Sequence, residues 1–102
     1  MTETEFDVPQ SSNLRGAAAL IEKACQDCGL RVSTRFSQQQ HPGCIHWHVK
    51  RGIQPGTLEL TLCETKRKIW ASVKDNRHAP WMDEALPQVK EAVETALRTA
   101  IS

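Results

Sequence analysis

The sequence predicts a two-layer α+β sandwich, in which a helix, a four-stranded antiparallel meander and a second helix follow one another. Two segments carry apolar residues at helical spacing, one near each end, and four segments between them alternate apolar and polar residues. The connections between those four segments are short, which suits antiparallel hairpins and excludes parallel crossovers. We expect both helices on one face of the sheet, because the helices and the sheet are each apolar on one side only.

Length and composition fit one small domain. The chain has 102 residues, of which 39% are hydrophobic and 25% charged. A chain of this length buries enough surface to fold without a disulfide or a metal. Residues 1–11 are polar and acidic, so we expect a flexible leader there and a single domain over residues 12–102.

The first helix is expected to start at Ser12 or Asn13 and to end at Gly29. A Ser or Asn side chain can accept a hydrogen bond from the free amides of a helix start, and glycine adopts the left-handed conformation that closes a helix. The apolar stripe between these points includes Cys25 and Cys28. This pair lies in the last turn, where the helix dipole disfavours a thiolate, so we interpret both cysteines as packing residues.

Four strands are expected at residues 30–37, 44–50, 57–63 and 68–74. Successive side chains of a strand point to opposite faces, so each segment has one apolar and one polar face. In the first strand, alternation assigns Val32, Thr34 and Phe36 to the core and Arg35 to the opposite face. In the second, it assigns Trp47 to the core.

The second helix is expected to begin near Pro87, after a short helical turn at residues 80–84. Proline disrupts a helix interior but fits the first turn. Apolar residues from Leu86 to Ile101 recur at helical spacing. We expect Trp81, which precedes this helix, to pack it against the edge of the sheet.

Symmetric hairpins bring polar residues of neighbouring strands together on the face away from the helices. A shift of two residues in any hairpin would keep the face but change the partners. The expected pairs are Cys44 with Cys63, His46 with Thr61 and Arg35, His48 with Glu59 and Ser33, Thr61 with Trp70, and Glu59 with Ser72.

We interpret this polar face as the surface on which the chain acts, because folding does not require such residues there. The chain is then a small binding or accessory domain. Its partner is a protein or a small ligand, with a second copy of the chain as one candidate. The residues expected to bind are Arg35, His46, His48, Glu59, Thr61 and Trp70.

A metal site is one alternative for the same face. Zinc is bound by imidazole and thiolate groups that converge on one point. The candidate ligands are His46, His48, Cys44 and Cys63, with Glu59 or His41 completing the shell. Because a His-x-His spacing often arises by chance, we expect no cofactor and keep zinc as the alternative.

Enzymatic activity and nucleic-acid binding are further alternatives. A metal-dependent or thiol enzyme would use Cys44, His46 and His48. We do not expect an enzyme, since the chain has no GxSxG, HExxH or phosphate-binding glycine loop. Residues 31–77 carry nine Lys or Arg against three acidic residues. With Trp70 as a stacking ring they would support weak nucleic-acid binding, although the net charge of the chain is only +1.

We expect a cytoplasmic protein without a membrane segment. No apolar run approaches the ~20 residues that span a bilayer, and the start lacks the pattern of a signal peptide. Thiols are kept reduced in the cytoplasm, so the four cysteines are expected to be free.

Overall fold

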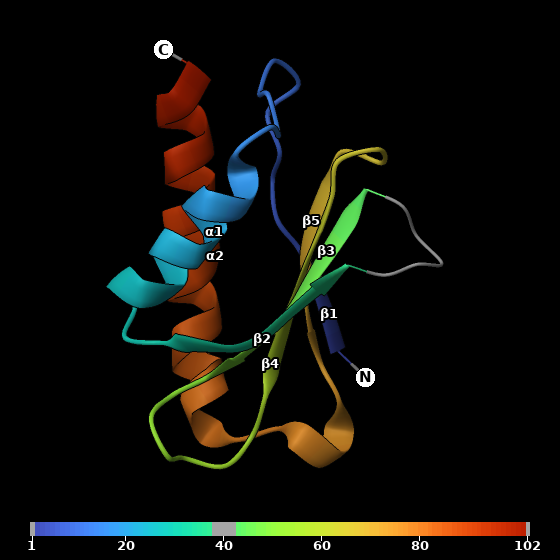
Figure 1. Cartoon of the computed structure of the whole chain (residues 1–102). Coiled ribbons are helices and arrows are strands. Elements are labelled where there is room, and N and C mark those ends of the chain that lie inside the picture. Colours follow the sequence, from blue (N-terminus) through green and yellow to red (C-terminus); the bar gives the residue numbers. More distant parts are fainter. Residues whose placement is uncertain (1, 38–42, 102) are drawn as a thin grey trace.

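The computed structural model describes residues 2–37 and 43–101 (Figure 1). These residues form a five-stranded antiparallel sheet and two α-helices, which confirms the predicted α+β class. The strand order is β1–β5–β4–β3–β2. The strands are β1 (Thr2–Glu5), β2 (Arg31–Ser37), β3 (Cys44–Lys50), β4 (Leu58–Cys63) and β5 (Lys68–Val73); the helices are α1 (Ala17–Asp27), α2 (Pro80–Ile101) and a 3₁₀ turn, η1 (Asp75–Arg77).

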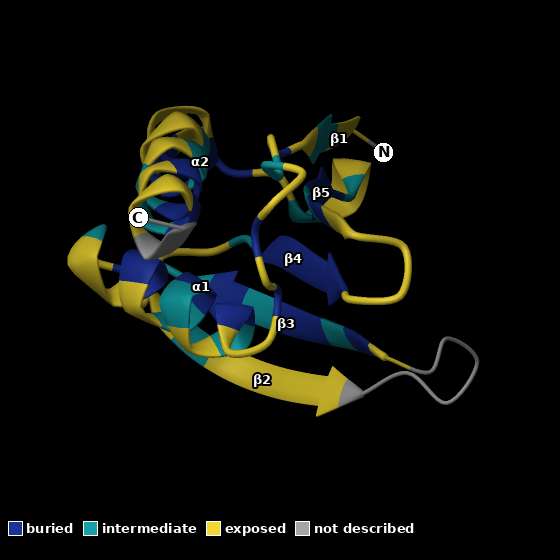
Figure 2. Ribbon diagram, turned by 90° about the horizontal axis from the view of Figure 1, so that it is seen from above, coloured by how far each residue is buried: buried dark blue, intermediate teal, exposed yellow. Residues whose placement is uncertain are grey.

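The hydrophobic core lies between the sheet and the helices. Figures 1 and 2 show α1 and α2 along the same side of the sheet. Trp47 of β3 is 0% exposed, and Leu60 of β4, Ile21 of α1 and Val89 of α2 belong to the same buried cluster. Burying one large apolar side chain stabilises a fold by about 1.5–3 kcal/mol. We call the opposite side of the sheet, away from the helices, the outer face.

Residues assigned to the flexible leader form the edge strand β1, which is the fifth strand of the sheet. Thr2–Glu5 pairs antiparallel with β5, and the amide of Phe6 donates to the Ile69 carbonyl at 2.8 Å. Phe6 is buried in the core. The sequence TETE has no apolar alternation that would predict a strand. Backbone hydrogen bonds to β5 and the buried Phe6 side chain hold this segment in place.

Glu94 of α2 ties the N-terminal segment to the helical layer. Its carboxylate accepts hydrogen bonds from the Asp7 amide at 2.8 Å and from Lys90 Nζ at 2.6 Å. Burial raises the pKa of Glu94, but the hydrogen bonds from Asp7 and Lys90 outweigh burial and bring the pKa below its ordinary value of 4.5.

Acid is therefore expected to weaken the attachment of the N-terminal segment. Because the pKa of Glu94 is lower in the folded chain, its contribution to stability is present above the ordinary pKa and is lost as the pH falls through the folded pKa. Glu94→Gln should lower the melting temperature at pH 7 and flatten its dependence on pH in the acid range. Thermal unfolding at a series of pH values measures both effects. Glu91→Gln, on the exposed side of α2, is the control, and equal pH profiles for wild type and Glu94→Gln would contradict the assignment.

Helix α1 begins later than the sequence predicts. Its first residue is Ala17, after Gly16 at φ 80°. Asn13 Oδ1 accepts from the Arg15 amide at 2.9 Å and Ser12 Oγ donates to the Pro9 carbonyl at 2.6 Å, so both side chains stabilise the turn before the helix. The end agrees with the expectation, since Gly29 is left-handed at φ 76°.

Helix α2 begins earlier than predicted, and Pro87 lies inside it. Pro87 has no N–H and cannot donate to the carbonyl four residues earlier. The turn before it is held by other contacts, because Trp81 and Met82 are buried and Trp81 Nε1–H donates to the Pro55 carbonyl at 2.9 Å. Within the described chain, neither helix is long and apolar enough to cross a bilayer.

The predicted side of Arg35 is wrong because β2 contains a bulge. The pairing of β2 with β3 shifts between Val32 and Thr34, so the residues that follow change faces. Arg35 now points to the helical side, where Nη1 donates to Glu22 Oε2 at 2.9 Å. Phe36 pairs with His46 on the outer face, where the sequence analysis had placed Arg35.

Candidate functional site

The outer face carries polar residues from the three adjacent strands β3, β4 and β5. Strand β3 is hydrogen-bonded on both sides, and so is β4, so the backbone fixes the positions of their side chains. The structure has the expected pairs between these strands. They are Cys44–Cys63, His46–Thr61, His48–Glu59, Thr61–Trp70 and Glu59–Ser72.

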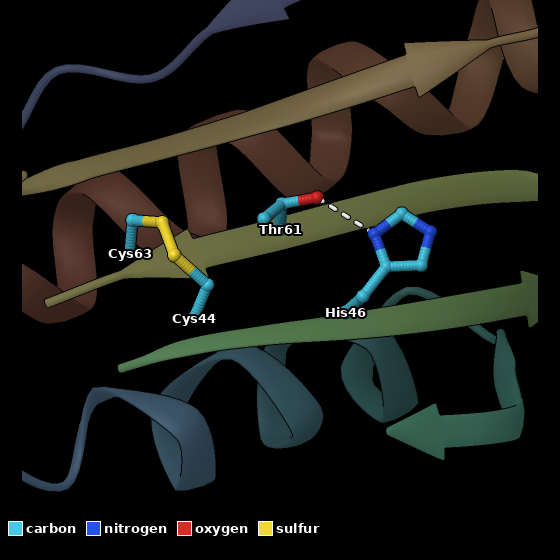
Figure 3. The surroundings of a disulfide bond; sticks show 4 residues. All are labelled: Cys44, His46, Thr61 and Cys63. Atoms are coloured by element: carbon cyan, nitrogen blue, oxygen red, sulfur yellow. Dashed lines mark hydrogen bonds between the residues drawn. A yellow bond between two sulfur atoms is a disulfide. The ribbon is translucent and has the colours of Figure 1, made fainter. Parts of the chain in front are cut away.

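Three of these residues form an imidazole–carboxylate cluster: His46, His48 and Glu59. Glu59 Oε1 lies 2.8 Å from His46 Nε2 and 3.5 Å from His48 Nε2. The potential ligand atoms of the three side chains all lie within 4.8 Å of one another. His46 Nδ1 is 2.8 Å from Thr61 Oγ1 (Figure 3). If His46 is neutral and its Nε2–H donates to the Glu59 carboxylate, then Nδ1 accepts a hydrogen bond from the Thr61 hydroxyl.

The cluster is largely buried although it lies on the outer face. His46 and Thr61 are buried, Glu59 is 5% exposed, and His48 is half-buried. Phe36 forms one wall, since its ring centre lies 4.9 Å from that of His46 and 5.5 Å from that of His48. His48 and Phe36 are the more exposed of these side chains.

One carboxylate oxygen of the cluster has no hydrogen-bond partner. Glu59 Oε2 is buried and makes no hydrogen bond within the described part of the chain. Lys74 Nζ lies 3.8 Å from it, at an ion-pair distance that is too long for a hydrogen bond. Leaving a buried acceptor unpaired costs roughly 1–3 kcal/mol.

His48 is kept neutral by its surroundings. Burial lowers its pKa, and the charges of Lys74 and Arg77 and the ring of His46 lower it further, although Glu59 raises it. The net pKa of His48 is below its ordinary value of 6.5. A neutral imidazole can offer a ring lone pair to a proton or a metal.

Cys44 and Cys63 are joined by a disulfide beside the cluster (Figure 3). The expectation that all four cysteines are free is wrong for this pair. Facing residues of an antiparallel pair lie close enough for such a bond, and these Cα atoms are 4.1 Å apart. While the disulfide is intact, neither sulfur can act as a thiolate ligand or nucleophile. Structural disulfides are typical of oxidising compartments, so the bond does not support the cytoplasmic expectation.

Cys25 and Cys28 are free thiols at the end of α1. Cys25 is buried, and burial, with smaller effects from Cys28 and Glu22, raises its pKa to about 12. Burial and then Asp27 also raise the pKa of Cys28. Raised pKa values favour unreactive thiols, in agreement with a packing role.

Trp70 lies on the outer face beside the edge strand. It is half-buried and pairs with Glu5 of β1 on one side and Thr61 on the other. A shallow hollow at this edge is lined by Glu3, Glu5, Lys66, Lys68 and Trp70. Strand β1, which the sequence analysis did not predict, places these acidic residues beside Trp70.

The structure thus groups His46, His48, Glu59 and Thr61, sets Trp70 next to Thr61, and removes Arg35 from the face. Sequence reasoning missed Phe36, because the bulge in β2 moves it to the outer face. The alternation of β5 puts Lys74 on the same face as Ser72, as the sequence predicts, and Lys74 lies next to Glu59. No protein-family model, curated protein or solved structure matches the chain.

Proposed function

We propose that this chain is a binding domain that holds a small ligand on its outer face, at the imidazole–carboxylate cluster. The incomplete hydrogen bonding of the buried Glu59 side chain is the observation that supports the proposal. Its carboxylate is 5% exposed and keeps one oxygen without a hydrogen bond in the described part of the chain. A buried charged group that is incompletely paired lowers stability, and well-packed apolar residues would serve folding better.

The limited access to the cluster favours a small ligand over a macromolecule. His46, Glu59 and Thr61 are buried, so a large partner would touch mainly His48 and Phe36. A small ligand would need to displace only the side chains next to the carboxylate in order to contact it. Small-molecule sites have this character, with a few convergent polar groups beside an apolar wall.

Lys74 and Arg77 lie near the cluster, but other basic residues of the sheet lie next to acidic residues elsewhere, which argues against a continuous nucleic-acid surface there. Arg35 pairs with Glu22 on the helical side. Lys66 and Lys68 lie at the edge of the sheet with two acidic residues of β1. Nucleic-acid binding would need a continuous basic surface.

Amide chemical-shift mapping of the ¹⁵N-labelled chain tests the proposal. Zinc chloride, inorganic phosphate and adenosine monophosphate are added separately. At least one is expected to shift the amides of β3 and β4 around His46, His48 and Glu59, and to leave the exposed positions Lys23 and Glu91 unchanged. Unchanged spectra with all three probes, or shifts confined to the helices, would contradict the proposed function.

A further inference from the structure

We infer that the imidazole–carboxylate cluster is a site for a divalent transition-metal ion of the zinc class, bound by His46 Nε2, His48 Nε2 and a Glu59 oxygen. The inference rests on the proposed function, because it names the ligand of the same face. Its support is the donor set, the separations of the donor atoms, and the Glu59 oxygen that makes no hydrogen bond in the described part of the chain.

The donor chemistry selects the class of metal. Two imidazoles and one carboxylate suit zinc, cobalt, nickel and iron(II), whereas calcium and magnesium prefer shells made of oxygen. Three protein ligands leave one position for water or another small ligand, as in open zinc sites. The Cys44–Cys63 disulfide removes the thiolate donors that a closed four-ligand site on this face would need.

The separations of the donor atoms are close to those of a metal shell. Atoms bound tetrahedrally at about 2.1 Å lie about 3.4 Å apart. The Glu59 Oε1 atom is 3.5 Å from His48 Nε2 and 2.8 Å from His46 Nε2, and the whole set lies within 4.8 Å. Side-chain shifts of about 1 Å would complete the shell, with no change in strand register.

Thr61 orients His46 as ligating histidines are oriented in metal sites. Such a histidine usually donates its second ring N–H to a polar group, which fixes the tautomer and the direction of the ring. Thr61 Oγ1 lies 2.8 Å from Nδ1, on the side of the ring opposite the Nε2 that meets Glu59. When Nε2 gives its lone pair to a metal, the ring proton resides on Nδ1. This N–H then donates a hydrogen bond to the Thr61 hydroxyl oxygen.

Glu59 Oε2 supplies the second, independent indication of a cation. It is buried and has no hydrogen bond in the described part of the chain, although its carboxylate faces two imidazoles. A cation between the three side chains would neutralise this carboxylate. Phe36 closes one side of the cluster with an apolar ring, which strengthens electrostatic attraction by excluding water.

Lys74 is expected to weaken the metal site. Its ammonium group lies 3.8 Å from Glu59 Oε2 and repels a second cation. The Lys74 side chain is 44% exposed, so it can turn towards solvent when a metal binds. Lys74→Gln should therefore tighten zinc binding, by about fivefold for a solvent-screened charge.

Isothermal titration of the full chain with zinc chloride at pH 7 tests the inference. One ion should bind per chain, and His48→Ala or Glu59→Gln should weaken binding by at least about tenfold. His78→Ala is the matched control. It removes another imidazole that faces a carboxylate, at 3.1 Å from Asp83, but within residues 2–37 and 43–101 this pair is not part of a group of three potential ligands. Its zinc affinity should equal that of the wild type.

Cobalt(II) gives a readout that does not depend on the folding of a variant. Bound to the wild-type chain, it should show the visible absorption of a tetrahedral ion. The metal inference would be overturned if zinc gave no heat of binding and cobalt(II) gave no tetrahedral spectrum. It would also be overturned if zinc binding were lost in His78→Ala but kept in His48→Ala. If phosphate or adenosine monophosphate still shifts the β3 and β4 amides, the proposed function survives; if no probe shifts them, both fail.

Discussion

Gly56→Ala is expected to lower the free energy of unfolding by about 3 kcal/mol. Gly56 has φ +102°, a conformation that residues with a side chain rarely adopt. An added Cβ would lie 2.7 Å from Met82 Cε, 2.8 Å from Ala79 Cβ and 3.0 Å from the Arg77 carbonyl oxygen. The Met82 side chain is flexible, but the other two atoms belong to η1 (Arg77) and to the residue before α2 (Ala79), and one of them is a backbone atom. The substitution would therefore push that end of the helix away from the start of β4.

Gly52→Ala is the matched control for this prediction. Gly52 also has a positive φ, +57°, but an added Cβ would meet nothing within 4 Å. Only the backbone cost remains, about 1 kcal/mol. Denaturant unfolding of both variants measures the difference. Equal losses for the two variants would contradict the close packing of Gly56 against α2.

His46→Leu alone is expected to destabilise the fold by about 3 kcal/mol, because Glu59 then stays buried without its closest partner. The His46 imidazole lies 2.8 Å from Glu59, at the centre of the cluster. Replacing the connected polar groups together, as His46→Leu, Glu59→Leu and Thr61→Val, removes the unpaired carboxylate. This triple variant should be as stable as the wild type or more stable, since apolar replacements of buried ionic groups are often neutral or stabilising.

The comparison of single and triple variants separates a site from a structural element. A polar cluster kept for a ligand is dispensable for folding, whereas a cluster that holds the sheet together is needed for it. His78→Leu, at an exposed imidazole–carboxylate pair, should change stability by no more than about 0.5 kcal/mol. A triple variant as unstable as His46→Leu would contradict the proposal that the cluster is retained for binding.

The sequence could predict the centre of the site because β3 and β4 alternate strictly. Ile45, Trp47 and Val49 mark one face, so His46 and His48 must lie on the other. Short hairpins then limit the register, and the expected neighbours of His46 and His48 on β4 are present. Periodicity thus located three of the cluster's features: its strands, its face and its pairing.

The rest depends on interactions that alternation does not encode. A bulge near Ser33 inserts one residue and moves Phe36 to the outer face, although the residues around it still alternate. Strand β1 is polar on both faces and is held by backbone pairing with β5. The disulfide follows from the proximity of Cys44 to Cys63, which the sequence analysis predicted, but redox state was inferred from the expected compartment instead.

Helix boundaries were missed for a related reason. Ser12 and Asn13 have the side chains of a helix start, yet their hydrogen bonds stabilise the turn before α1. Pro87 was taken as a first residue, but buried Trp81 and Met82 extend α2 through the earlier turn. At α2 tertiary packing outweighed a local preference, whereas at α1 local side-chain hydrogen bonds favoured a turn over the helix start.

Long-range ¹H–¹⁵N spectra of the histidine rings, recorded while zinc chloride is added, are the most direct test of whether the outer face binds its ligand at the imidazole–carboxylate cluster. The Nε2 signals of His46 and His48 are expected to move together and to saturate at one zinc per chain, while His78 stays unchanged. If the His46 and His48 rings do not respond, or if only His78 responds, the central claim is contradicted.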